Sequence, residues 1–481
     1  MRELGDKGFF LAGTETKSKK RITVLAPWDQ RELGSVALAG EKQAWEAARL
    51  AADASAEMAA MPSYRRSEML HLVARGIEAE REAFVTGMVA EAGKPAKAAQ
   101  GEVDRAVLTF RTAAEETLRR EGEVMPLDWA AGSEGRWSMM RRFPRGPVLA
   151  ITPFNFPLNL VAHKLAPAIA VGCPVVLKPA PQTPFTAIRL AELVYKAGDA
   201  AGWPKGALSV LHLENEVTQK LAAENEDIRQ VSFTGSAKVG WALKQSAGMK
   251  PVLLELGGNA GMIVAGDWPE IAGAAKKAVR AATGYAGQSC ISVQRVFVEQ
   301  PIFHRFIDAA VAEAEALQCG DPADEGTDVG PLIRPSDAQR VRDWVREAKS
   351  GGAKILAGKN GHGSVVPPVI VTGAKPGMKV LDEEVFGPVM VIERFEKFDE
   401  ALAAVNRSRY GLQAGLFTRD AGKIFRAYEQ LEVGGLVVGD TPTWRMDPMP
   451  YGGVKASGLG REGVRYAMEE MTEPRLLVMA L

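Results

Sequence analysis

PVLAITPFNFP, residues 147–157, opens a regular alternation of short apolar runs and helical segments. Four more apolar runs follow: PVVLK (174–178), LSVLHL (208–213), IRQVSF (228–233) and PVLLEL (251–256). Residues 183–196 and 237–247, which lie between these runs, have helical patterns. Alternating strands and helices predict an α/β fold whose parallel sheet has helices on both faces and binds nucleotides at its strand ends.

A second alternation begins near Gly257 and predicts a second α/β region. Its candidate strands are GMIVA (261–265), VQRVFVE (293–299), PPVIVT (367–372) and VMVIERF (389–395). Upstream of both regions, residues 41–120 have helical periodicity, and residues 125–145 favour strands. The final run, PRLLVM (474–479), is a strand without a partner nearby in the sequence. Such a strand often completes the sheet of another subunit, so we expect an oligomer.

Length and charge limit the class of protein. A chain of 481 residues is long for one core, so two large domains and a smaller element are expected. The chain has 59 basic and 59 acidic residues, and therefore no net field that would gather nucleic acid or an anionic membrane. The longest apolar stretch, residues 165–177, is shorter than the roughly 20 residues of a membrane span. We expect neither a nucleic-acid partner nor a membrane partner.

Three scattered cysteines, Cys173, Cys290 and Cys319, do not form a disulfide framework, and their spacing does not indicate a zinc site. The N-terminus mixes acidic and basic residues around a short apolar run, which is not typical of a secretory signal. We therefore predict a cytoplasmic protein without a bound metal.

The segment GQSC (287–290) places a thiol at a turn before an apolar strand. Backbone N–H groups or a helix N-terminus there would lower the pKa of Cys290 and make it a nucleophile. The alternative is a small buried apolar residue, the interpretation given to Cys173 and Cys319.

Polar residues also stand at the ends of the predicted strands. Glu255 ends an apolar run before two glycines, where it is either a general base or a capping or surface residue. Asn155, between two phenylalanines, is either a donor suited to an oxyanion or an ordinary turn residue.

FTGSAKVG (233–240) can bind a pyrophosphate through Gly235, Ser236 and helix amides, although Gly-Ser turns are common. Lys178 ends the second strand, facing either a phosphate or ribose or plain solvent.

Taken in order, FNFP, KPA, FTGS, ELGG, GQSC, EEVFGP and PYGGVKASGLGRE resemble the aldehyde dehydrogenase superfamily, and the resemblance covers essentially the whole chain. It implies a Rossmann-like nucleotide-binding domain (1–121 and 145–254), an α/β catalytic domain (255–456) and a small β oligomerisation element (122–144 and 457–481). It also implies a homodimer or homotetramer.

The resemblance implies a mechanism as well. Cys290 attacks the aldehyde carbon, and the oxyanion is held by the Asn155 side chain and the Cys290 backbone N–H. Hydride transfer to the nicotinamide leaves a thioester, which is hydrolysed by water that Glu255 activates. Glu462 lies on a polar path behind the thiol.

For the cofactor, the family pattern places Lys178 and Glu384 at the ribose hydroxyls, Gly235 and Ser236 at the pyrophosphate, and Phe386 near the nicotinamide. The complete implied set is Thr152, Pro153, Phe154, Lys178, Ala180, Pro181, Phe233, Thr234, Gly235, Ser236, Val239, Leu256, Glu384 and Phe386. Pro181 replaces a glutamate that is common in NAD-preferring members and that would repel a 2′-phosphate. NADP is therefore acceptable, with NAD favoured. Phe154 stands where tryptophan is frequent, a conservative change.

The resemblance also bears on the class of substrate. The segments around Cys290 and Pro450 look most like lactaldehyde and phosphonoacetaldehyde dehydrogenases, which implies a short polar aldehyde such as lactaldehyde. Arg445, with His163 or Arg105, would bind an anionic group if they gather at the substrate mouth. A CoA-acylating enzyme is the closest alternative, but such enzymes generally lack the glutamate base. A catalytically silent relative would have lost Cys290, Asn155 or Glu255.

Overall fold

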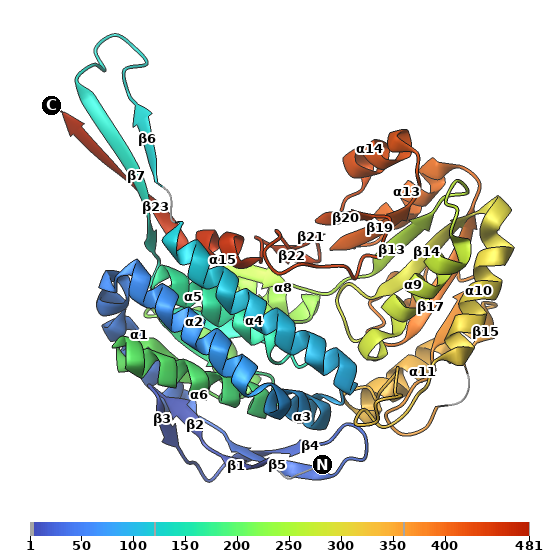
Figure 1. Ribbon diagram of the computed structural model, residues 1–481, viewed down its shortest axis with the longest axis horizontal. Coiled ribbons are helices and arrows are strands. Elements are labelled where there is room, and N and C mark those ends of the chain that lie inside the picture. The colour runs from blue at the N-terminus through green and yellow to red at the C-terminus, as the bar shows by residue number, and fades with distance from the viewer. Residues whose placement is uncertain (1–3, 120–121, 359–360, 481) are drawn as a thin grey trace.

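The computed structural model describes residues 4–119, 122–358 and 361–480, which form two α/β lobes and a projecting arm (Figure 1). The first lobe contains an eight-stranded sheet in the order β22-β12-β11-β8-β9-β10-β2-β3. Its five central strands run parallel and are the five apolar runs predicted from the sequence. They are β8 (Val148–Ile151), β9 (Val175–Lys178), β10 (Leu208–Val210), β11 (Gln230–Thr234) and β12 (Val252–Glu255).

Short strands extend both edges of this sheet, and a small separate sheet lies near the N-terminus. The edge strands are β2 (Phe9–Leu11), β3 (Thr14–Thr16) and β22 (Gly458–Leu459). The separate sheet has the order β1-β5-β4 and consists of β1 (Gly5–Lys7), β4 (Arg21–Leu25) and β5 (Glu32–Ala37).

Helices cover both faces of the first sheet because successive strand residues point to opposite sides. Val148 and Ala150 join a core formed mainly with α2 to α6, whereas Leu149 and Ile151 join one formed with α1, α7 and α8. These helices are α1 (Glu41–Ala60), α2 (Ser63–Ala79), α3 (Arg81–Ala92), α4 (Ala96–Leu118), α5 (Asn159–Val171), α6 (Pro184–Ala201), α7 (Asn215–Glu224) and α8 (Ala237–Ser246).

The second lobe has a seven-stranded sheet in the order β15-β16-β17-β14-β13-β19-β20. Its strands are β13 (Ala260–Val264), β14 (Val293–Glu299), β15 (Lys354–Ala357), β16 (Val369–Thr372), β17 (Val389–Phe395), β19 (Gln413–Phe417) and β20 (Gly435–Val438). One face packs on α9 (Ile271–Thr283), α10 (Phe303–Ala316) and α11 (Pro335–Ser350), and the other on α13 (Phe398–Asn406) and α14 (Ala421–Gln430). The remaining elements here are α12 (Lys379–Asp382), β18 (Tyr410–Gly411) and β21 (Val454–Lys455).

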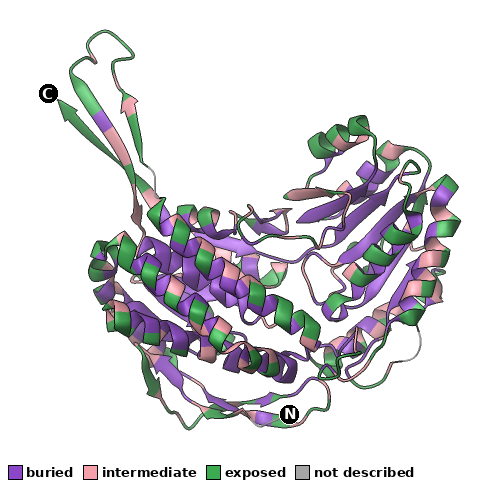
Figure 2. Ribbon diagram, in the orientation of Figure 1, coloured by how far each residue is buried: buried purple, intermediate pink, exposed green. Residues whose placement is uncertain are grey.

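The arm is a three-stranded sheet that extends away from the first lobe and is largely exposed (Figure 2). It consists of β6 (Glu123–Pro126), β7 (Arg136–Pro144) and β23 (Thr472–Ala480). β23 pairs along its whole length with β7 of the same chain and forms one edge of the sheet, so its pairing with another subunit stays a prediction. Its partner is simply remote in sequence.

The segment predicted as the C-terminal part of the oligomerisation element is divided in the structure. β22 belongs to the edge of the first sheet, and α15 (Val464–Glu470) packs on α5 and α4. Only β23 continues into the arm. The proposed domain boundaries themselves stay a prediction.

The two lobes are joined end to end through residues 256–259, because β12 ends at Glu255 and β13 begins at Ala260. The carboxyl ends of strands in the first sheet therefore approach the amino ends of strands in the second. In the described part of the chain, every helix is too short or too polar to cross a membrane.

Candidate active site

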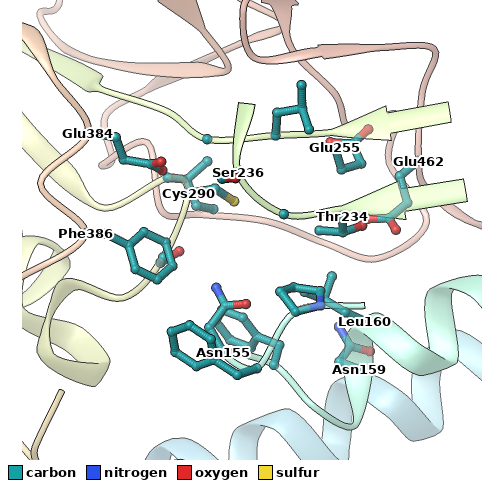
Figure 3. A pocket seen from close by; sticks show the side chains of 18 of the residues that line it. Asn155, Asn159, Leu160, Thr234, Ser236, Glu255, Cys290, Glu384, Phe386 and Glu462 are labelled. Carbon is teal, nitrogen blue, oxygen red and sulfur yellow. The ribbon is translucent and has the colours of Figure 1, made fainter. Parts of the chain in front are cut away.

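A cavity of about 300 Å³ lies between the two sheets, and Figure 3 shows the side chains that point into it. The first sheet contributes the loop after β8, the β11–α8 turn and the end of β12. The second lobe contributes the turn before β14 and the segment before β17. The predicted site residues on its wall are Arg105, Pro153, Phe154, Asn155, Thr234, Gly235, Ser236, Glu255, Leu256, Cys290, Glu384, Phe386, Arg445 and Glu462.

Cys290 lies in the turn between a short 3-10 helix (Gly284–Gly287) and β14. Its Sγ is 2.9 Å from the Tyr451 hydroxyl oxygen. Burial raises the pKa of Cys290 to about 12; the hydrogen bond to Tyr451 opposes the rise, and Glu384 adds to it. The expected lowering of the pKa by a helix N-terminus is wrong, because a strand and not a helix follows the thiol.

Asn155 follows β8 and is fixed by the cysteine loop. Its Nδ2 donates to the carbonyl oxygen of Gln288 at 2.9 Å, and the side chain is buried. A primary amide has a second N–H, which this contact leaves available. Gln288 is two residues from Cys290. This one hydrogen bond therefore fixes the position of the Asn155 amide relative to the loop that carries the Cys290 thiol.

Two buried carboxyl groups in the cavity have opposite electrostatic environments. Burial and the neighbouring Glu462 raise the pKa of Glu255 well above its usual value, and neither of its oxygens has a hydrogen-bond partner among the described residues. Burial also acts on Glu462, but the surrounding positive groups hold its pKa below the usual range. Arg445 is 3.0 Å from Glu462, and Lys164 is 4.0 Å from it. Pairs of carboxyl groups with separated pKa values are typical of acid–base sites.

The predicted anion-binding residues gather at one end of the cavity, but each has a partner. Arg445 stacks on the Tyr451 ring, 3.7 Å from its centroid. Arg105 binds Asp447 through two nitrogens, at 2.7 and 3.1 Å. His163 is 1% exposed, binds Asp447 at 2.7 Å and lies behind the cavity wall. It was predicted to contact substrate, but on the wholly buried helix α5 it instead holds Asp447.

The predicted cofactor residues follow the strand ends in sequence order. Ser236 precedes the first turn of α8, whose free N–H groups suit a pyrophosphate. Glu384 accepts from the Gly258 N–H at 2.9 Å, and burial raises its pKa to about 7. Lys178 is buried rather than solvated, and burial lowers its pKa. Outside this cavity lie Thr152, Lys178, Ala180, Pro181, Phe233 and Val239.

This donor set fits a nicotinamide dinucleotide. Helix amides complement phosphates, and a lysine with a carboxylate complements ribose hydroxyls. Phe154 and Phe386 meet edge to face, with ring centroids 6.0 Å apart, and give the inner part of the cavity an apolar surface.

Three contributors were not predicted from the sequence. Tyr451 lies in a segment that was read only as a glycine-rich loop, and its motif PYGG was the available signal. Gln288 and Asp447 act through backbone and side-chain contacts with residues more than 100 positions away. Gln288 lies within the GQSC motif, but no local pattern indicates its contact with Asn155, and none marks Asp447.

Comparison with known proteins agrees with this geometry. Residues 14–477 match the sequence model of the aldehyde dehydrogenase family. A 3-sulfolactaldehyde dehydrogenase from Priestia aryabhattai is 42% identical over 474 residues, which cover 98% of each chain.

Two solved structures are also similar. Aldehyde dehydrogenase 21 from Physcomitrella patens, in complex with the reaction product succinate, has a TM-score of 0.96 and 39% identity, covering 99% of this chain and 98% of that chain. Glyceraldehyde-3-phosphate dehydrogenase GapN from Methanocaldococcus jannaschii, complexed with NADP, has a TM-score of 0.92 and 36% identity, covering 96% and 100%. The chain therefore belongs to the aldehyde dehydrogenase family and is an oxidoreductase that acts on aldehydes with a nicotinamide cofactor.

Proposed function

We propose that this enzyme oxidises a short polar aldehyde, preferably one with an anionic group, to the carboxylic acid through a thioester on Cys290. The observation that carries the proposal is that one cavity contains the Cys290 thiol, the Asn155 amide and the Glu255 carboxyl group. These are a nucleophile, an oxyanion donor and a base, the three groups that acyl chemistry needs.

In the first half-reaction, Cys290 Sγ bonds to the aldehyde carbon and the carbonyl oxygen becomes an oxyanion. The free N–H of Asn155 Nδ2 and the backbone N–H of Cys290 donate to that oxygen. When bound, the nicotinamide supplies the hydride acceptor that allows the adduct to become a thioester. Phe154 and Phe386 keep this part of the cavity apolar, which strengthens the hydrogen bonds to the oxyanion.

In the second half-reaction, Glu255 accepts a proton from the water that attacks the thioester. The raised pKa of Glu255 means that its ionised, basic form grows with pH, while Arg445 and Lys164 favour that form. The carbon–sulfur bond breaks and the acid leaves. Glu462 balances the positive charges of Lys164 and Arg445 beside Glu255, and its lowered pKa makes it a poor acceptor, so the proton on Glu255 returns to solvent.

Hydrolysis distinguishes this proposal from transfer to CoA. An acylating enzyme has no need of a buried carboxyl group without partners next to its thiol, whereas a hydrolytic enzyme does. A silent protein would have no reason to keep all three groups around one cavity.

The purified enzyme should reduce NAD or NADP with lactaldehyde, glycolaldehyde, succinic semialdehyde or a phosphonate or phosphate aldehyde in the absence of CoA. Cys290→Ala should abolish turnover, and Asn155→Ala should lower kcat by about 10²–10³-fold because one oxyanion donor is lost. Glu255→Gln should stop after one equivalent of reduced cofactor per chain, because the thioester is no longer hydrolysed.

Cys319 is exposed, so its interpretation as a small buried residue was wrong. Cys319→Ala is the control and should keep turnover within about twofold of the wild type. Turnover by Cys290→Ala would refute covalent catalysis at this residue. Turnover that requires CoA would instead establish the acylating reaction.

The positive charges of two arginines on the cavity wall support an anionic substrate. Arg105 and Arg445 both line the wall, and the Arg105 side chain is 30% exposed, so part of its guanidinium can meet a ligand. Asp447 orients Arg105 through two hydrogen bonds. The names of the three relatives refer to a sulfonate, a carboxylate product and a phosphate, which agrees with this preference.

Arg105→Met should raise KM for the anionic aldehydes by about tenfold or more, because one hydrogen bond between charged groups is lost. KM for glycolaldehyde and lactaldehyde should stay within about twofold. Arg111→Met, on the same helix but paired with Glu78 at the surface, is the matched control. Equal increases in KM for anionic and neutral aldehydes would contradict an anion-binding role. Arg445 is less suitable for this test, because its replacement also removes the ion pair with Glu462.

We propose that both nicotinamide cofactors are used, with NAD favoured. Pro181 offers neither a hydrogen bond to the ribose nor a charge that would repel a 2′-phosphate. Pro181→Glu should therefore lower kcat/KM for NADP by about tenfold or more through like-charge repulsion while NAD is still used. Steady-state rates at varied cofactor concentration measure the change. An equal loss of kcat/KM with both cofactors would show that residue 181 does not discriminate between NAD and NADP through the 2′-phosphate.

We propose a homodimer or homotetramer assembled through the arm. β23 exposes Leu476, Leu477, Val478 and Met479 on a sheet only three strands wide, an apolar surface that a single chain does not cover. Leu476→Glu with Val478→Glu, on one face of β23, should lower the mass measured by light scattering towards the 51.6 kDa of one chain. Met249→Glu, at an exposed apolar position on the body, is the control. A wild-type monomer, or a double variant of unchanged mass, would refute assembly through β23.

A further inference from the structure

Tyr451 makes a direct contact with the sulfur of the proposed nucleophile. Its hydroxyl oxygen is 2.9 Å from Cys290 Sγ, within the range of a hydrogen bond to sulfur, and its side chain is 3% exposed. The mechanism above does not use this hydroxyl. The thiol is in an environment that disfavours its ionised form, so a neighbour that stabilises negative charge on the sulfur affects reactivity directly.

The surroundings hold the Tyr451 ring in place from two sides. Its backbone N–H donates to the carbonyl of Glu462 at 2.8 Å, and Glu462 returns a hydrogen bond to the Tyr451 carbonyl. The Arg445 guanidinium covers the ring at 3.7 Å and is itself bound to the Glu462 side chain. Ile291 and Leu412 pack around the ring and the cysteine. The hydroxyl is therefore directed at the sulfur by packing, not by a flexible rotamer.

The chemistry of the two groups decides which one donates once the sulfur is ionised. Burial, with the nearby Cys290, raises the pKa of Tyr451 well above its usual value, so the phenol keeps its proton. A neutral phenol beside a thiolate can only donate. The charge on Arg445 opposes the rise in the phenol's pKa and makes it a stronger donor.

We propose that Tyr451 is a catalytic residue whose phenol donates a hydrogen bond to Cys290 Sγ and stabilises the thiolate in both half-reactions. The proposal rests on the role of Cys290 as the nucleophile given above. Before attack, the thiol releases its proton to solvent and the sulfur accepts the hydrogen bond from Tyr451. When the thioester is hydrolysed, the carbon–sulfur bond breaks, its electron pair stays on the sulfur, and the same O–H stabilises the departing thiolate. The phenolic proton stays on oxygen throughout.

Alkylation of Cys290 by iodoacetamide tests this without any turnover. The thiolate forms a carbon–sulfur bond and iodide leaves, so the rate follows the ionised fraction. Loss of one hydrogen bond to a charged sulfur raises its pKa by about one to two units. Since a more basic thiolate is also more nucleophilic, with a Brønsted coefficient of about 0.4 to 0.5, alkylation of Tyr451→Phe at fixed pH should be about 3- to 10-fold slower.

The full-length chain is used in a Cys319→Ala background, so that the exposed thiol does not react, and Cys290→Ala in that background gives the blank. Tyr195→Phe is the matched control, because it removes another hydroxyl, which is part-buried and donates to the Leu208 carbonyl at 3.3 Å. Its alkylation rate should stay within about twofold of the parent. Replacement of Tyr451 by 3-fluorotyrosine gives a more acidic phenol and should accelerate alkylation, a change that a structural role of the ring does not produce.

An unchanged rate in Tyr451→Phe, or a faster one, overturns the proposal; a faster rate would show that the hydroxyl accepts from the thiol instead. An unchanged rate with 3-fluorotyrosine overturns it as well, even if Tyr451→Phe folds poorly. The outcome is separate from that of the proposed function. Turnover that survives Cys290→Ala would refute the nucleophile, whereas the alkylation series reports on the hydrogen bond alone.

Discussion

The active-site geometry depends on the four-residue connection between the two sheets, residues 256–259. A Cβ at Gly257 would lie 2.1 Å from a carboxylate oxygen of Glu384, and one at Gly258 would lie 2.1 Å from the Cys290 carbonyl oxygen. Both distances are far below van der Waals contact, so these neighbours can approach only a backbone without side chains. The two glycines therefore allow Glu384 and Cys290 to approach the backbone of this connection.

This close connection brings the carboxyl ends of one sheet to the amino ends of the other. Asn155 and Glu255 lie at the carboxyl ends of strands in the first sheet. Cys290 and Glu384 lie before the amino ends of strands in the second sheet. Parallel sheets normally bind ligands at their carboxyl ends, because the loops there converge. Here a second sheet closes that edge, and the candidate site lies in the cavity between the two sheets.

Buried charges connect the helical layer to both walls of the cavity. Glu102 of α4 forms an ion pair with Lys94 and accepts from the backbone N–H groups of Leu158 and Asn159, just after the Asn155 loop. Lys94 Nζ lies over the rings of Phe156 and Tyr285, 3.9 and 4.5 Å from their centroids. A buried charge is costly unless it is paired, so these contacts constrain the two loops together. The loops that carry Asn155 and Cys290 are thereby held by one polar cluster.

The sequence by itself determined the strands, their alternation with helices and the polar residues at the strand ends. These features are local: side-chain periodicity reports burial, and a residue that ends a strand stays there in any packing. Asn155, Ser236 and Glu255 were found for this reason. The GQSC turn marked Cys290 as a candidate, and the order of the motifs then indicated the family and, with it, the roles of Cys290 and Glu384.

Only the tertiary structure decided what those residues meet. The raised pKa of Cys290, the hydroxyl of Tyr451 at its sulfur and the partner of β23 all depend on contacts across more than 100 residues. The position of His163 behind the wall, rather than at the substrate, depends on which face of a wholly buried helix meets Asp447. Periodicity does not encode such contacts, because burial and electrostatics are set by neighbours that are distant in the chain.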